Sequence, residues 1–225
     1  MSQKLFSDYM MSDFERAQKN VDPVQLCWDQ IAGMRIEEIC SGKGAKAIGP
    51  NLITFKFIDR DIFCNINEKS LKYIDGKPID DLQTKLVLLL YIRSERNGAQ
   101  SRKEARSDND PISPLQLPNG EVFFRGLHTI PTTPLEEIFG KNPEGFLNAG
   151  MALGGKALNK GDASFCLIAL PHIKIYFILY AEDEEFPSRV TIMLSEGVNH
   201  YLPLDGIWAL CNVVVKRLLE IEADR

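Results

Sequence analysis

Four consecutive carboxylates, Glu182 to Glu185, are the side chains whose type and spacing most suggest chemistry. Carboxylates bind divalent cations or serve as a general acid and base. In extended backbone, neighbouring side chains point to opposite sides, so at most two of the four converge, Asp183 and Glu185. The alternative is a solvated turn whose charges keep flanking apolar strands from aggregating. The sequence leaves both interpretations open.

The segment that must position these carboxylates is residues 163–202, which carry the strongest strand signal in the chain. Side chains alternate along it because a strand repeats every two residues. One face is purely apolar and is predicted to be buried: Ile173, Ile175, Phe177 and Leu179. The other face is mixed and is predicted to meet a ligand, a partner or water: His172, Lys174, Tyr176, Ile178 and Tyr180.

Three further residues complete the candidate ligand site. His128 ends a predicted strand over 121–128, and Gly154 and Gly155 lie in a predicted helix over 143–159. Small residues in a helix permit close approach by another helix or a ligand, although each glycine costs up to ~1 kcal/mol of helix stability. The predicted ligand-binding set is therefore Asp183, Glu185, Lys174, Tyr176, Tyr180, His128, Gly154 and Gly155.

The chain shows no catalytic signature, so no catalytic residue, metal or cofactor is assigned. Residues 150–156, GMALGGK, match the spacing of a phosphate-binding loop, but Ala157 stands where a hydroxyl would hold Mg²⁺. The three histidines are too far apart in sequence for a local metal motif, and they form a site only if the fold brings them together: His128, His172 and His200.

A glycine-rich loop over 41–51 carries two lysines, Lys43 and Lys46. It is typical of a flexible, solvated turn. The alternative is a loop that holds an anion on its backbone N–H groups.

The remaining patterns predict an α+β fold, with a mainly antiparallel sheet of five or six strands and helices packed against it. Helices are expected over 4–18, 24–32, 78–94, 133–140 and 203–222, and a hairpin over 53–67. We interpret residues 1–225 as one domain with four parts: N-terminal helices (1–34), a hairpin plus core helix (35–96), a mobile loop (97–118) and a C-terminal α+β part (119–225).

The composition limits which partners and which cellular compartment are expected for the protein. A net charge of -5 argues against nucleic-acid binding, which needs a clustered basic surface. The longest membrane-like run, Leu86 to Ile92, falls far short of the ~20 residues that span a bilayer. Five cysteines without a CxxC pair are typical of reduced thiols. We therefore expect a soluble cytoplasmic protein with neither a nucleic-acid nor a membrane partner.

Several segments carry a family resemblance: 117–120 (LPNG), the Gly154-Gly155 pair, Gly161-Asp162, 170–187 and 201–210. The most specific is the apolar strand that ends in Asp183 to Pro187. Over about residues 35–220 the chain resembles the uncharacterised prokaryotic domain-of-unknown-function family 3786. Proteins of that family occur mostly in anaerobic bacteria and archaea, and some are fused to a four-cysteine iron–sulfur module, which this chain lacks.

The resemblance implies a binding or accessory role near Fe–S, corrinoid or one-carbon metabolism, and it transfers no catalytic residue. Our first hypothesis is a non-catalytic binding protein for a small molecule or a tetrapyrrole, or for a metalloprotein partner. The second is a metal-assisted hydrolase or transferase that uses the acidic run over 182–185. The third is a pure protein-interaction module.

Overall fold

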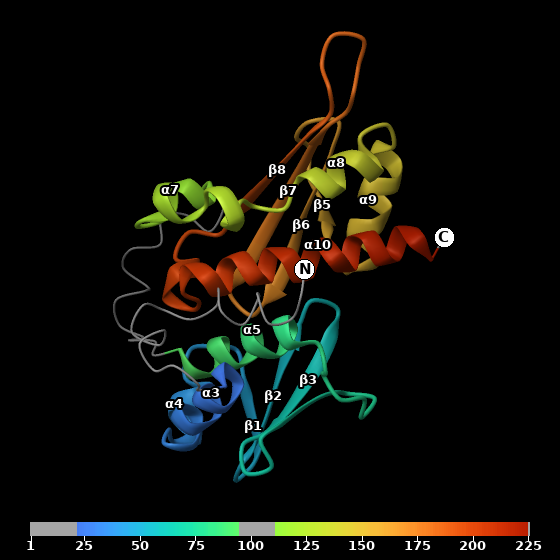
Figure 1. The fold of residues 1–225 in the computed structure, drawn as a ribbon. Helices are drawn as coiled ribbons and strands as arrows, with labels where there is room; N and C mark the ends of the chain where they lie inside the picture. Colours follow the sequence, from blue (N-terminus) through green and yellow to red (C-terminus); the bar gives the residue numbers. More distant parts are fainter. Residues whose placement is uncertain (1–21, 95–110, 225) are drawn as a thin grey trace. The chain divides into compact units, whose positions relative to one another are not determined.

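The computed structural model describes residues 22–94 and 111–224 (Figure 1). The predicted helix over 4–18 and most of the predicted loop over 97–118 lie outside the described residues. The described part divides into two compact units. The first unit comprises residues 22–56, 60–94 and 199–210, and the second comprises residues 57–59, 111–198 and 211–224. The prediction of a single folding domain stays a prediction.

The α+β class is confirmed, but the strands form two four-stranded antiparallel sheets instead of one sheet of five or six. The first sheet has the order β1 (Lys46–Gly49), β2 (Leu52–Phe57), β3 (Arg60–Asn65) and β4 (Ser70–Tyr73). The second has the order β5 (Lys156–Ala157), β6 (Ala163–Leu170), β7 (Ile173–Tyr180) and β8 (Arg189–Leu194). The edge strands β1, β4 and β5 are short, and this is why their sequences gave little strand signal.

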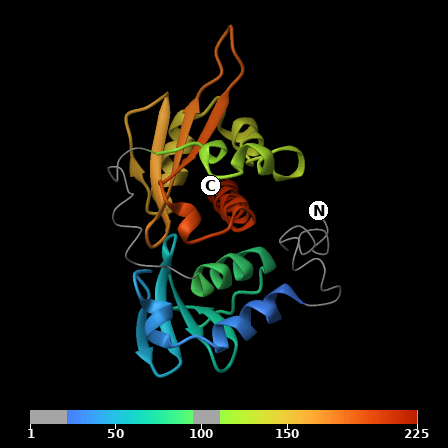
Figure 2. The same cartoon turned by 90° about the vertical axis from the view of Figure 1, so that its left-hand side faces the viewer.

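Three helices accompany the first sheet: α3 (Pro23–Ala32), α4 (Ile36–Cys40) and α5 (Leu82–Arg93). The predicted start of α3 is confirmed, since the Asp22 carboxylate accepts a hydrogen bond of 2.9 Å from the Val24 amide. The helix α5 begins four residues later than predicted because Asp81 caps it, accepting a hydrogen bond from the Thr84 amide. It packs beside α3 and against the sheet (Figure 2), where the Tyr91 and Phe55 rings lie 5.7 Å apart.

In the second unit β7 is the central strand of a meander, paired with β6 on one side and β8 on the other. Its apolar face is buried as predicted: Ile173, Ile175, Phe177 and Leu179 are fully shielded from solvent. The helix α9 (Pro143–Ala152) packs on β6, and the shorter helix α8 (Thr133–Phe139) packs against β8. The last helix, α10 (Leu204–Ala223), buries an apolar stripe that includes Ile207, Cys211, Val214 and Leu218.

The predicted strand over 121–128 is wrong. These residues form a short helix, α7 (Gly120–Phe123), followed by a 3-10 turn, η2 (Gly126–His128). Asn119 starts the helix in the left-handed conformation, with φ of 63°. An apolar alternation of only a few residues does not distinguish a strand from a short helical turn, and this is why the prediction failed.

Two boundaries also differ from the prediction. The helix α9 ends at Ala152 instead of continuing to residue 159, because Gly154 takes a positive φ of 79° and the chain then enters β5. The end of the predicted loop is ordered: Ile112 pairs with Leu194, and a 3-10 helix, η1 (Pro114–Gln116), follows. Ser113 caps η1, and its hydroxyl accepts a hydrogen bond from the Leu115 amide.

Candidate functional site

The acidic run forms an exposed turn between β7 and β8 that projects beyond the sheet (Figure 1). The Asp183 carboxylate accepts hydrogen bonds of 2.9 Å from the Glu185 amide and 2.7 Å from the Phe186 amide. Glu182 contacts Lys141 at 3.3 Å, and its amide donates to the Gly140 carbonyl. These contacts shape the turn, so the solvated-turn interpretation describes Asp183 well.

The mixed face of β7 is partly closed. Lys174, Tyr176 and Tyr180 share that face as predicted, but Tyr176 is only 8% exposed, whereas Tyr180 is 49% exposed. In the sheet Tyr176 lies between Cys166 of β6 and Met193 of β8. On the predicted ligand face, Lys174 and Tyr180 at the two ends are therefore accessible to a ligand, whereas Tyr176 in the middle is not.

His172, which was predicted to share this face, instead occupies the tight turn before β7, with a φ of 67°. The reason is the Pro171-His172 pair, which connects β6 to β7 and lies outside both strands.

The small residues of α9 serve contact between the helix and the sheet. A Cβ atom at Gly150 would lie 2.5 Å from the Phe165 ring of β6, and one at Gly155 would lie 2.7 Å from the Gly150 carbonyl oxygen. Gly154 faces open space. His128 stacks on Phe123, with ring centroids 4.4 Å apart.

The predicted site residues thus lie at separate places in the second unit: the acidic turn, the mixed face of β7, η2 and the end of α9. Within the part of the chain that the structure describes, no three His, Cys, Asp or Glu side chains come together as metal ligands.

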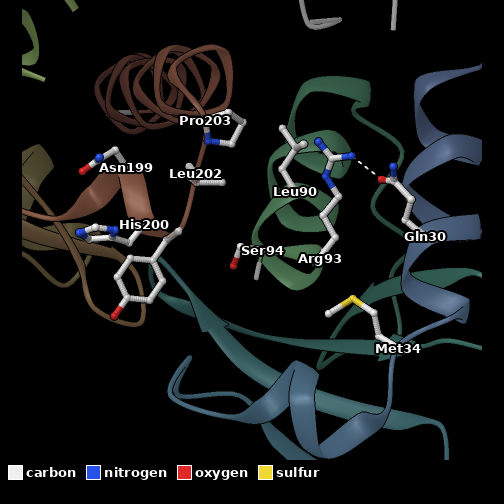
Figure 3. A pocket seen from close by; sticks show the side chains of 10 residues that line it. Gln30, Met34, Leu90, Arg93, Ser94, Asn199, His200, Leu202 and Pro203 are labelled. Carbon is white, nitrogen blue, oxygen red and sulfur yellow. Dashed lines mark hydrogen bonds between the residues drawn. The ribbon is translucent and has the colours of Figure 1, made fainter. Parts of the chain in front are cut away.

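A pocket of about 610 Å³ lies in the first unit (Figure 3). Three segments that are distant in sequence line it: the end of α3, the end of α5, and the chain from the 3-10 turn η3 (Val198–His200) to the start of α10. The lining residues are Gln30, Met34, Leu90, Arg93, Ser94, Asn199, His200, Tyr201, Leu202 and Pro203. Among them only His200 was a candidate site residue from the sequence, because no single segment carries a binding motif.

Arg93 is the main cationic group of this pocket. Its guanidinium donates a short hydrogen bond to the Gln30 side-chain oxygen (Figure 3), which orients the group between the two helices. The Ser94 hydroxyl donates to the Tyr91 carbonyl at 2.8 Å, and a hydroxyl oxygen can still accept a hydrogen bond while it donates one. Asn199 and His200 are exposed on the segment that faces α5. The pocket therefore combines a fixed cation with hydrogen-bonding groups.

Lys43 supports the α5 side of the pocket from within the first unit. Its side chain is only 1% exposed, and its Nζ donates a hydrogen bond of 2.7 Å to the Ile92 carbonyl near the end of α5. In return the Tyr91 hydroxyl donates to the Lys43 carbonyl, and the Tyr91 ring stacks on Tyr201 at 6.2 Å. Neither sequence interpretation of the glycine-rich loop is right for Lys43: the lysine caps a helix, while Lys46 is exposed on β1.

None of the five cysteines forms a disulfide bond. Burial raises the pKa of both Cys64 and Cys211 to about 12. Burial also raises the pKa of Cys166, although the nearby Lys174 charge acts against it. Thiols with raised pKa values are poor nucleophiles and poor metal ligands at neutral pH.

Comparisons with known proteins place this chain in a family without assigning an activity. Neither a curated protein nor a solved structure matches it. Across residues 22–94 and 111–224, no helix combines the length and apolarity needed to cross a bilayer. The family model described as "Domain of unknown function (DUF3786)" matches residues 35–217. The match includes two of the three segments that line the pocket around Arg93 (the Arg93 pocket), but not the segment with Gln30 and Met34. The chain therefore belongs to the DUF3786 family.

Proposed function

We propose that this protein is a non-catalytic binding protein whose small-molecule ligand occupies the Arg93 pocket. The observation that carries the proposal is the pocket itself. Its volume of about 610 Å³ lies within the range of roughly 300–1,000 Å³ that small-molecule sites occupy. Its lining mixes apolar side chains, such as Met34 and Pro203, with polar ones, such as Arg93 and Asn199.

Each side of the pocket has a distinct chemical role. Met34 and Pro203 supply accessible apolar surface against which a ligand body can pack. Leu90 and Leu202 also line the pocket but are nearly fully buried. Arg93 and Asn199 supply hydrogen-bond donors that can orient the ligand. The Arg93 guanidinium donates to the Gln30 side-chain oxygen, which links α5 to α3 at this pocket.

The metabolic setting is a second part of the proposal. We propose that the ligand, or a metalloprotein partner, belongs to anaerobic Fe–S, corrinoid or one-carbon metabolism, and that the protein acts in the cytoplasm. The support for the setting is the resemblance to family members that are fused to an iron–sulfur module. The support for the compartment is the set of five unbridged cysteines. A visible spectrum and a metal analysis of protein purified anaerobically from its native host test the setting: a colourless, metal-free and ligand-free preparation contradicts it.

A matched pair of substitutions tests the pocket. Asn199 and Asn67 are both exposed asparagines of the first unit, and Asn67 lines a different, smaller pocket of about 460 Å³. We expect Asn199→Trp to block the Arg93 pocket and Asn67→Trp to leave it open. The experiment is a fragment screen by ligand-observed NMR on the wild-type protein and on both variants. The proposal fails if the fragments that bind wild-type protein also bind Asn199→Trp with unchanged affinity.

A further inference from the structure

We infer that the hairpin tip between β7 and β8, residues 181–188, docks onto a separate protein that carries an apolar pocket bordered by Lys and Arg side chains. The hairpin belongs to the second unit, so this inference does not depend on the Arg93 pocket of the first unit. It follows from three properties of the hairpin: its exposed aromatic side chains, the hydrogen bonds that fix its shape, and the charge around Phe186.

The hairpin exposes aromatic surface that the second unit does not bury. Phe186 in the tip is 65% exposed, and Tyr180 at the end of β7 is 49% exposed. Throughout residues 22–94 and 111–224, every other Phe, Tyr and Trp side chain is buried or half-buried. The exposed aromatic side chains of the described chain are therefore concentrated on one hairpin, and aromatic side chains are enriched in protein–protein interfaces.

Hydrogen bonds fix the shape of the tip, which projects beyond the second sheet (Figure 1). The Asp183 carboxylate accepts from the Glu185 and Phe186 amides, and the Asp183 amide donates to the Phe186 carbonyl at 3.1 Å. At the base of the tip, the Ala181 amide donates to the Asp162 carboxylate at 2.8 Å. Phe186 is thus presented on a preformed turn, and a preformed binding segment loses less conformational entropy when it binds.

The charge around Phe186 specifies the chemistry of the partner. Glu184 and Glu185 are exposed, and within the described residues their carboxylates take part in no hydrogen bond or ion pair. The Glu182 carboxylate, by contrast, contacts Lys141 at 3.3 Å. The exposed ring therefore lies next to two uncompensated negative charges. Lys and Arg side chains around an apolar pocket complement such a tip, because interfaces pair surfaces of opposite charge.

The same charge disfavours two other occupants. An anionic lipid surface repels carboxylates and attracts Lys and Arg, which the residues of the tip lack. A second copy of this chain has a net charge of -5 and presents an equally acidic tip, so two copies repel each other at this hairpin. A separate protein with a cationic surface is therefore favoured over a membrane and over self-association.

The first experiment replaces Phe186 with the photo-crosslinking amino acid p-benzoylphenylalanine in the full chain, expressed in its native host. Irradiation joins this side chain to a protein within reach, and mass spectrometry identifies that protein. The matched control carries the same amino acid in place of Val122, which is 79% exposed on α7 of the same unit. We expect an adduct with a separate protein from position 186 and not from position 122.

The second experiment measures the affinity of the identified protein, once purified, for variants of the full chain by isothermal titration calorimetry. Phe186→Ala should weaken binding by about 30-fold or more, the loss typical of a truncated interface anchor. Glu184→Gln combined with Glu185→Gln should weaken binding and reduce its dependence on salt, because salt screens contacts between charges. Glu121→Gln combined with Glu196→Gln, which neutralises two exposed carboxylates elsewhere in the second unit, should bind as the wild-type chain does.

Several results would overturn the inference. The absence of an adduct from position 186, an adduct only with a second copy of the chain, or the same adduct from both positions contradicts a specific partner at the tip. Unchanged affinity in Phe186→Ala contradicts the apolar contact, and affinity that does not fall with added salt contradicts the cationic surface. Because the Phe186 ring is exposed, Phe186→Ala should keep the wild-type urea midpoint, so that a loss of binding reports on the tip and not on unfolding.

Discussion

Substitution of Gly150 by alanine should destabilise the protein, although alanine is the better helix former. Helix propensity alone favours alanine by about 1 kcal/mol. A Cβ atom at this position, however, would lie 2.5–2.6 Å from three carbons of the Phe165 ring, whereas carbon atoms normally approach to about 3.5–4.0 Å. The ring or the helix must therefore shift by about 1 Å.

The Phe165 ring has little room for such a shift. It is fully buried, and it lies 5.0 Å from the Phe177 ring and 5.1 Å from the Phe146 ring. Overpacking of a tight core costs about 1–3 kcal/mol, and this enclosed ring places the cost near the upper end. After the gain in helix propensity, we expect a net loss of about 2 kcal/mol.

Urea denaturation followed by circular dichroism measures this loss. Phe165→Leu in the Gly150→Ala background is the control, since a smaller side chain makes room for the new methyl group. The double variant should lose less than the sum of the two single losses. If Gly150→Ala stabilises the protein by about 1 kcal/mol, the close packing of α9 on β6 is refuted.

Three more predictions concern the β-sheet, the acidic turn and the thiols. Phe177→Ala should lower the free energy of unfolding by about 3–5 kcal/mol, since the ring is fully buried; a loss below about 1 kcal/mol in urea denaturation would contradict this. Asp183→Ala should lower the free energy of unfolding by about 1 kcal/mol, because two hydrogen bonds within the turn are lost. Glu185→Gln should leave the urea midpoint unchanged. Equal losses of stability in the two variants would contradict the turn interpretation. Burial raises the pKa of Cys211 to about 12, so almost no thiolate forms at pH 8. We therefore expect Cys211 not to react with Ellman's reagent at pH 8 until the protein is unfolded. Rapid labelling of Cys211 in the native protein, detected by mass spectrometry, would contradict its burial.

Local signals predicted much of the second unit. Alternation of apolar side chains predicted β7 and identified its buried face correctly. The same signal overestimated the openness of the opposite face, because Tyr176 is covered by neighbours on adjacent strands that a single strand does not reveal. The start of α3 is set locally, because the Asp22 cap and Pro23 act within a few residues.

The Arg93 pocket could not be predicted in the same way. The residues that line it come from segments near residues 30, 90 and 200. Contacts between segments so far apart leave no periodic pattern in the sequence of any one of them. The burial of Lys43 could not be predicted from the sequence either. A lysine between glycines indicates a solvated loop, and only the unpaired carbonyls at the end of α5 explain why its ammonium group is buried.

The first unit is assembled from separated stretches of chain, and this has a consequence for the order of events during synthesis. The ribosome adds Arg93 about 110 residues before Pro203, so both helices of the pocket leave the exit tunnel before its third wall exists. At roughly 5–20 residues per second, this delay lasts about 5–20 s. A nascent chain therefore cannot capture a ligand in this pocket while it is still making the second sheet. The walls of this pocket are therefore complete only after the segment around residue 203 has been synthesised.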